Sequence, residues 1–184
     1  MTLWLWACGP QPQFVEAVAP TVTGIQARFG ENEVAARSAW ASPEGVVAHD
    51  VTVSVNESPR FEVTADVVDW RQANGTAVFE GHVRLVRGTL TLLADTLDAH
   101  VVGERVITAV AEGAVRVRRE AWSAIADRAT LDLAARTLAL EGNLRMADAG
   151  RSVTAQRVTV WLDEDRVVCD ACSIAFTSDP LIDP

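Results

Sequence analysis

Apolar and polar residues alternate with a period of two over most of the chain, which is the pattern of β-strands that bury one face. Val83 and Leu85, for example, flank the charged Arg84. The same order of side chains follows Gly113 and Gly142. The chain is therefore predicted to be all-β, with apolar rows along one face of its strands.

Two sequence marks recur at a spacing of about 30 residues, and self-similarity at that period is typical of stacked repeats. We predict about five units of two strands each. One mark is Ala-Asp, which is expected to begin a strand, and the other is Glu-Gly in the second half of the unit. The Ala-Asp marks are Ala65-Asp66, Ala94-Asp95 and Ala126-Asp127, with a degenerate copy at Ala155-Gln156, and the Glu-Gly marks are Glu80-Gly81, Glu112-Gly113 and Glu141-Gly142.

Short polar segments separate the predicted strands. Asn74-Gly75 is the sharpest turn signal, because both residues tolerate the positive φ of a tight hairpin. The predicted organisation is an N-terminal tether at residues 1–26, a repeat domain at 27–176 and a tail at 177–184. The other breaks lie at Gly103-Glu104, Ala135-Arg136 and Glu164-Asp165, and between units at Arg87-Gly88, Arg119-Glu120 and Asp148-Ala149-Gly150.

Two alanine-rich stretches have the composition of helices. The alternation within 121–135 continues the repeat and predicts a strand there. For 33–40 the helix stays open, and the segment upstream of Ala65 is expected to form an irregular extra unit.

Charge and hydropathy narrow the function classes. The chain has 184 residues, a formal net charge of -9 and a pI near 4.8, which disfavours a nucleic-acid partner and an anionic membrane surface. No apolar run reaches the roughly 18 residues of a membrane-spanning helix.

The N-terminus carries a possible anchor. Leu5-Trp6-Ala7-Cys8 resembles the lipobox of bacterial lipoproteins, and Pro10, Pro12 and Pro20 follow it in a tether-like segment. However, only seven residues precede Cys8 and none is basic, unlike a complete export signal. Cys8 is therefore a lipidation candidate, with a free thiol as the alternative.

The unit from 65 to 88, ADVVDWRQANGTAVFEGHVRLVRG, and the two copies after it resemble the OstA-like domain of the lipopolysaccharide-transport proteins LptA and LptC. This resemblance implies an open, V-shaped β-jelly roll in the periplasm that passes lipopolysaccharide toward the outer membrane. It also implies other transport proteins as partners, joined through edge strands, and neither a cofactor nor enzymatic activity.

An apolar trough for acyl chains is expected between the strands, because each methylene exposed to water costs about 0.8 kcal/mol. A structural or glycan-binding β-solenoid of the cell envelope with a filled core remains an alternative, and so does a glycan-active enzyme. The predicted trough residues are Val83, Leu85, Val115, Val117, Leu144, Met146, Leu97 and Leu131.

Other chemistry-bearing residues have plainer interpretations. A residue that recurs in every unit is expected to have a structural role in that unit. We therefore expect Asp66, Asp95 and Asp127 to bond nearby backbone rather than to catalyse a reaction. Arg84, Arg116 and Arg145 form an outward row, either solvated or facing phosphates. No metal site is predicted, since the histidines show no ligand spacing. The remaining residues are His49, His82 and His100, expected at the surface, and Trp40, Trp70, Trp122 and Trp161, expected in the core or at its rim.

Cys169 and Cys172 form a C-x-x-C pair that suggests a disulfide in an oxidising compartment. A regular strand would hold their Cα atoms about 10 Å apart, beyond the roughly 7 Å limit for bridging. A bridge therefore requires a turn or bulge at Asp170-Ala171, and both the bridged and the free states stay open.

Overall fold

The structure, a computed structural model, describes residues 22–29, 32–56, 59–103, 105–148, 150–164 and 166–176. These residues form one antiparallel sheet of twelve strands, which confirms the predicted all-β class. The elements are β1 (Val22–Phe29), β2 (Asn32–Ser42), β3 (Gly45–Val55), β4 (Phe61–Arg71), η1 (Gln72–Asn74), β5 (Thr76–Arg87), β6 (Leu90–Val102), β7 (Arg105–Arg119), β8 (Trp122–Asp132), β9 (Thr137–Asp148), β10 (Arg151–Trp161), β11 (Val167–Asp170) and β12 (Ser173–Phe176).

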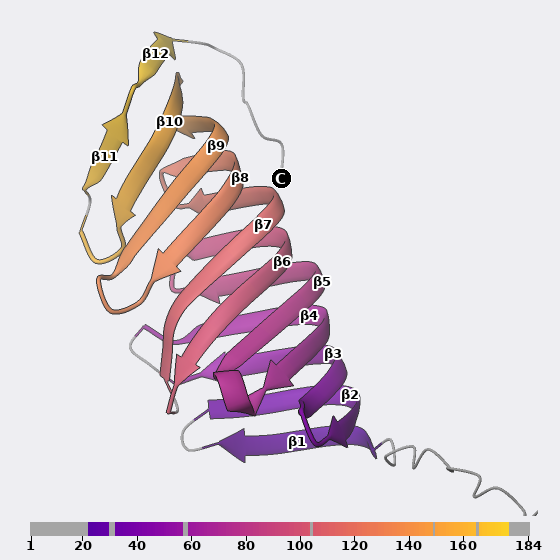
Figure 1. The fold of residues 1–184 in the computed structure, drawn as a ribbon. Helices are drawn as coiled ribbons and strands as arrows, with labels where there is room; N and C mark the ends of the chain where they lie inside the picture. The colour runs from indigo at the N-terminus through magenta and orange to yellow at the C-terminus, as the bar shows by residue number, and fades with distance from the viewer. Residues whose placement is uncertain are drawn as a thin grey trace, which may run out of the picture.

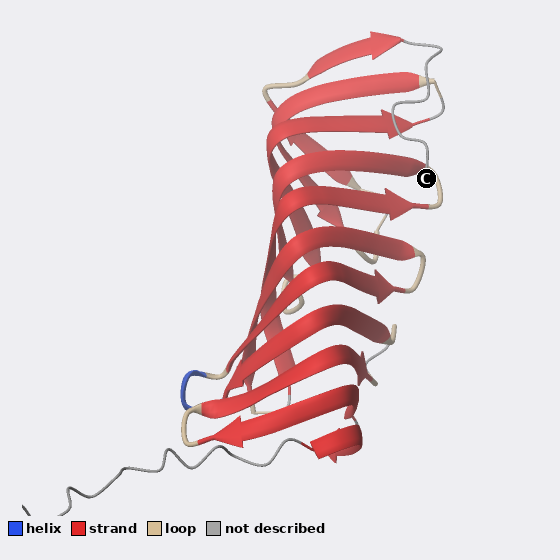
Figure 2. Ribbon diagram, turned by 90° about the vertical axis from the view of Figure 1, so that its right-hand side faces the viewer, coloured by secondary structure: helices blue, strands red, loops and turns tan. Residues whose placement is uncertain are grey.

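The strands follow one another across the sheet in chain order, from β1 to β11. Neighbouring strands run antiparallel from β1 to β10, and β11 and β12 both run antiparallel to β10. Figures 1 and 2 show the strands stacked along the long axis of the molecule, and in Figure 1 they run from the indigo β1 to the yellow C-terminal strands. The sheet is open, and its edges are β1 on one side and β11 with β12 on the other.

The long strands bend sharply near their middles (Figure 2). In β7 the bend is a bulge in which Gly113 and Ala114 both have left-handed backbone, with φ of 78° and 45°. The pairing register with β8 shifts at the same place, between Glu112 and Val115. Bulges bend a strand and increase its twist. Here they line up into a crease. It is made of Gly81-His82, Gly113-Ala114 and Gly142-Asn143 on β5, β7 and β9 and of Asp66, Asp95 and Asp127 on the neighbouring strands β4, β6 and β8.

The positions of the aspartates contradict the prediction that each Ala-Asp mark begins a strand beside a turn. Asp66 and Asp95 lie in the middles of β4 and β6, and Gly81 lies in the middle of β5. The prediction was wrong because glycine followed by a residue with positive φ looks the same in sequence whether it forms a turn or a bulge. The marks therefore identify where strands bend, and the strands run through them.

The crease divides the sheet into two arms whose inner faces share one hydrophobic core. The first arm contains residues 83–87 of β5 and 90–94 of β6, and the second contains 76–80 and 96–102 of the same strands. Inward positions alternate with exposed ones on both arms, as the period-two pattern predicts. Each buried Val or Leu stabilises the fold by roughly 1.5–3 kcal/mol.

The N-terminal part of the sheet is more regular than expected. The stretch 33–40, where a helix stayed open, lies in strand β2, which pairs with β3 from Glu33 to Ser42. The sheet also begins at Val22, before the predicted domain boundary at residue 27. Alanine content favours helix only weakly, and neighbouring strands override it. Residues 1–21 of the tether predicted at 1–26, with Cys8 among them, and the predicted tail at 177–184 lie outside the described residues.

The last strand is split in two and carries the cysteine pair. β11 pairs with residues 157–160 of β10, and β12 pairs with residues 151–154 of the same strand. Between them Ala171 has a left-handed φ of 51°, and a disulfide joins Cys169 to Cys172, whose Cα atoms lie 6.0 Å apart. The disulfide turn thus sits on the crease, in the place where β5, β7 and β9 have their bulges.

We expect Gly113→Ala to destabilise the fold by about 2 kcal/mol. The new methyl group would lie 2.8 Å from the Cβ of Asp95, and alanine disfavours the left-handed φ. The free energy of unfolding, measured in urea, checks this. Gly103→Ala is the control, because Gly103 also has positive φ but no atom within 4 Å of an added Cβ. Equal losses for both variants would contradict the crease contact. Asp95→Gly removes the Cβ that the new methyl group meets, so it should reduce the loss for Gly113→Ala only.

We expect the double variant Cys169→Ser/Cys172→Ser to loosen the β11–β12 edge. Each of these strands has four residues, and the link restricts their freedom in the opened state. Amide exchange over 167–176 should accelerate about tenfold or more, while β8 and β9 keep their protection. Reduction of the disulfide in the wild-type protein should accelerate amide exchange to the same extent. The same reducing agent should not change exchange in the double variant. Unchanged exchange in both would show that strand pairing alone holds the edge.

Candidate functional site

The interior between the arms is the candidate functional site, and it contains every predicted trough residue. Val83, Leu85, Val115, Val117, Leu144 and Met146 come from the first arm, and Leu97 and Leu131 come from the second. All of them belong to one continuous hydrophobic cluster. The sequence pattern therefore selected residues that the fold brings together on one inward surface.

This interior is packed shut at those positions. The predicted trough residues are between 1% and 9% exposed, so their side chains fill the space that was predicted to be an unfilled channel. Apolar side chains that face one another across a fold leave water by closing together. An acyl chain would therefore lie between the arms only after displacing these contacts.

The two arms are parts of one unclosed sheet. A β-solenoid would wind continuously around its core, whereas this chain reverses at each arm tip and forms a single unclosed sheet. The ladder hydrogen bonds run between neighbouring strands within the sheet. The arms are consequently held by the crease on one side and by side-chain contacts on the other.

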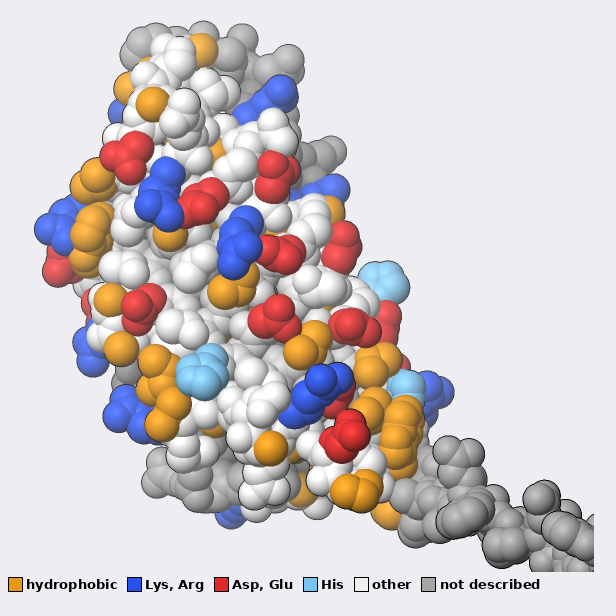
Figure 3. Space-filling view, in the orientation of Figure 1, with side chains coloured by type: hydrophobic (Ala, Val, Ile, Leu, Met, Phe, Trp, Pro, Cys, Tyr) orange, Lys and Arg blue, Asp and Glu red, His pale blue; other side chains and the backbone are white. Residues whose placement is uncertain are grey.

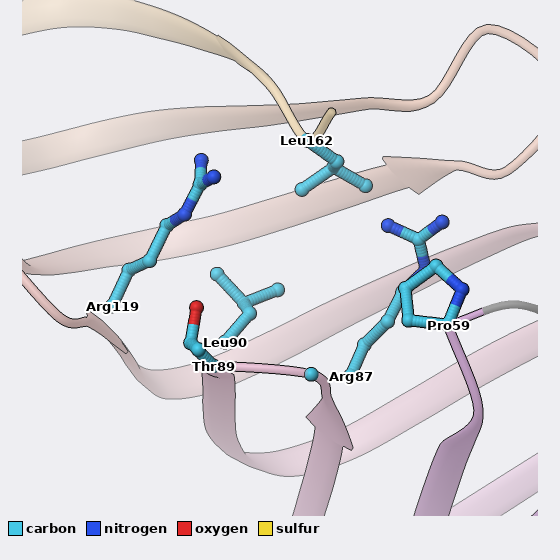
Figure 4. Close-up of a pocket in the computed structure, with 7 residues that line it drawn as sticks. Pro59, Arg87, Thr89, Leu90, Arg119 and Leu162 are labelled. Atoms are coloured by element: carbon cyan, nitrogen blue, oxygen red, sulfur yellow. The ribbon is translucent and has the colours of Figure 1, made fainter. Parts of the chain in front are cut away.

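A pocket lies at the mouth, where the tips of the two arms meet (Figure 4). Its volume is about 210 Å³, and it is lined by Pro59, Arg87, Gly88, Thr89, Leu90, Arg119 and Leu162. Arg87 forms an ion pair with Asp163 at 3.8 Å, which links the end of β5 to the turn after β10. Sequence analysis missed this pocket, although Arg87 and Arg119 had both been noted at breaks between units.

The repeated aspartates lie on the outside of the crease. The carboxylate of Asp66 contacts Nδ1 of His82 at 2.7 Å, and Nδ2 of Asn143 donates to Asp127 at 2.7 Å. A Cβ added at Gly113 would overlap Asp95. Each aspartate thus contacts the bulge on the next strand, and the partners of Asp66 and Asp127 are side chains rather than the nearby backbone that was predicted.

The outer faces carry charges of both signs. Arg84, Arg116 and Arg145 are exposed there. Near the crease Arg128 donates to Glu112 at 2.6 Å, and Arg157 pairs with Glu141. Figure 3 shows acidic and basic side chains interspersed over this surface, as in the solvated interpretation of the arginine row. Exposed pairs of this kind contribute about 0–1 kcal/mol each.

The aromatic residues divide between core and surface. Trp70 and Trp122 pack against the core, and the guanidinium of Arg166 lies 3.5 Å from the Trp161 ring centre. Trp40 was predicted in the core or at its rim but is exposed, with its ring 5.3 Å from that of His49. Its neighbour Ala39 takes the inward position, so alternation turns Trp40 outward.

Two kinds of feature are absent from the part of the chain that the structure describes. Within the described residues, no group of three or more His, Cys, Asp or Glu is placed to hold a metal ion. The described residues also contain no helix that is long and apolar enough to cross a membrane.

Comparisons with known proteins point to one family. A family profile described as "LptA/(LptD N-terminal domain) LPS transport protein" matches residues 62–166. Among solved structures the chain is similar to LptH from Pseudomonas aeruginosa, the LptA-homologous periplasmic component of the lipopolysaccharide transport device. The TM-score is 0.55 and the identity 14%, and the match covers 67% of this chain and 95% of that one. No curated protein sequence matches the chain.

The creased, unclosed sheet with its apolar interior is an open β-jelly roll, and the likeness to LptH supports this class. The chain belongs to the LptA/LptD N-terminal-domain family of lipopolysaccharide-transport proteins, because the family profile spans more than half of its length. The family predicted from the repeats is confirmed.

We expect His82 to titrate above the ordinary pKa of histidine. Its hydrogen bond and charge attraction to Asp66 raise the pKa, with a smaller contribution from Asp95. Because the folded-state pKa is the higher one, the contact stabilises the fold below the unfolded pKa and loses this effect as pH rises through the folded pKa. NMR titration of the His82 ring checks this. Asp66→Asn should lower the pKa, whereas Asp127→Asn, on an equivalent crease position, should not; equal behaviour of both variants would contradict it.

Proposed function

We propose that this protein binds the acyl chains of lipopolysaccharide between its two arms and passes the lipid across the periplasm toward the outer membrane, as an LptA- or LptC-like component. The observation that carries the proposal is the continuous apolar interior of an unclosed sheet. Membership of a lipopolysaccharide-transport family supports it independently.

The lipid can enter the interior because its acyl chains replace the apolar side-chain contacts between the arms. Opening the arms exposes the trough side chains, which is unfavourable by about 25 cal/mol per Å² of apolar surface. Acyl chains inserted between the arms cover that surface again and leave water themselves, at about 0.8 kcal/mol per methylene. The closed interior is thus the lipid-free state, and the lipid replaces side-chain contacts with its own.

Both sheet edges suit pairing with other transport proteins. Edge strands present unpaired backbone groups to a further strand. The β11–β12 edge also exposes Val167, Val168 and Ile174, and the β1 edge exposes Val22, at 43–62% of each residue's surface. Strand addition at these edges would align the interiors of successive molecules.

Cys8 is the proposed site of attachment to the inner or outer membrane. A lipid-modified Cys8 followed by the proline-containing tether would hold the sheet in the periplasm near one membrane. With an unmodified Cys8 the protein would act as a soluble carrier. Mass spectrometry of Cys8 in the protein from its native host distinguishes these cases.

The filled interior also favours a second candidate, a structural or glycan-binding envelope protein. The low exposure of the trough residues supports it. On this alternative the arms would stay closed, and ligands would meet only the outer faces.

A photo-reactive amino acid at Leu85 or at Val117 should capture lipopolysaccharide in cells. Arg84 and Arg116 are matched controls, because each lies beside a trough residue but on the outer face. Adducts at the inward positions and none at the outward ones are expected. The reverse pattern, or no inward adduct in folded protein, would reject lipid transport in favour of the envelope protein.

A further inference from the structure

The mouth pocket combines a cationic side with an apolar side. Arg87 ends β5 and Arg119 ends β7, so both belong to the tip of the first arm. Leu90 and Leu162 are buried and continue into the hydrophobic core. In Figure 4 the two arginines reach from the first arm toward Leu162 on the second. A ligand here would meet positive charge and the entrance to the interior together.

Arg87 is unusually buried for a charged residue. Only 9% of its side-chain surface is exposed, and its ion pair with Asp163 is 3.8 Å long, beyond hydrogen-bond distance. Asp163 accepts a 2.6 Å hydrogen bond from Arg136 instead. A guanidinium has five N–H donors in a planar fork that fits the oxygens of phosphate. Asp163 therefore supplies Arg87 with counter-charge at a distance and leaves its donors available to the pocket.

The pocket is small. About 210 Å³ is less than the roughly 300 Å³ at which sites for drug-sized molecules begin. One phosphate fits this space, whereas a set of acyl chains does not. Thr89 and the backbone of Gly88 add polar groups beside it.

We propose that the mouth pocket receives the phosphate of an acylated amphiphile, with Arg87 binding its oxygens in the positive field of Arg87 and Arg119 while its acyl chain enters between the arms. This inference rests on the proposed function and adds the headgroup chemistry. Asp163 acts as the counter-ion of Arg87 while the pocket is empty.

An exchange of the counter-ion of Arg87 would link binding of the phosphate headgroup to opening of the two arms. Arg87 lies on the first arm and Asp163 at the tip of the second, so separating the arms pulls the pair apart. A buried cation left without an anion is costly. The phosphate restores the counter-charge at the moment when the acyl chain needs the interior, so an anionic amphiphile opens the arms more readily than a neutral one.

The test compares dodecyl phosphate, dodecyl maltoside and inorganic phosphate, titrated below micelle-forming concentrations by calorimetry. Wild-type protein should bind dodecyl phosphate about tenfold or more tighter than dodecyl maltoside, and inorganic phosphate far more weakly than either. Arg87→Gln should remove the preference for dodecyl phosphate, and Arg119→Gln should reduce it. Arg84→Gln, on the outer face of the same strand, is the matched control and should change nothing. Asp163→Asn should tighten dodecyl phosphate severalfold.

The outcomes separate this inference from the proposed function. If both detergents bind equally and Arg87→Gln affects neither, the phosphate site is rejected while binding in the interior survives. If inorganic phosphate binds as tightly as dodecyl phosphate, the pocket takes free anions and the amphiphile is rejected. If neither detergent binds, binding in the interior fails as well. Far-UV circular dichroism confirms folding, and the independent Arg119→Gln variant keeps the test decisive if Arg87→Gln unfolds.

Discussion

The contact between an aspartate on one strand and a glycine bulge on the next determines the shape of this molecule. At Gly113 the backbone approaches Asp95 so closely that a methyl group does not fit, and the left-handed φ of the bulge redirects the strand. Repeated at Gly81 and Gly142 against their own aspartates, this contact bends neighbouring strands at one level. A flat sheet of the same strands would leave its apolar face in water, whereas the creased sheet folds that face onto itself.

Much of this was predictable from sequence, because side-chain alternation specifies which face of a strand is buried. The inward positions Val83 and Leu85 and the outward Arg84 followed directly from the pattern. The bend did not, because a left-handed residue gives the same local signal in a turn as in the middle of a strand. Pairing distinguishes the two, and pairing joins residues far apart in the chain, such as Glu112 with Arg128.

The mouth pocket shows a second limit of sequence reasoning. Arg87 and Asp163 are brought together only by the folding of one arm over the other, and no local pattern links them. The closed interior has the same origin, since alternation indicates that Leu97 and Leu131 point inward but not how close the opposite arm lies. The sequence therefore identifies which side chains face inward, and the bend at the crease determines which of these side chains contact one another across the two arms.

The order of strands in the sheet, which is their order in the chain, has a consequence for folding and for the size of the protein. Most strand pairings join strands that follow one another in the chain, so each pairing closes only a single hairpin. Growth can proceed from one hairpin to the next, as in repeat proteins whose stability is a sum of neighbour interactions. Adding or deleting a hairpin would lengthen or shorten the interior by about 10 Å, given the strand spacing of about 4.8 Å, without redesigning the rest.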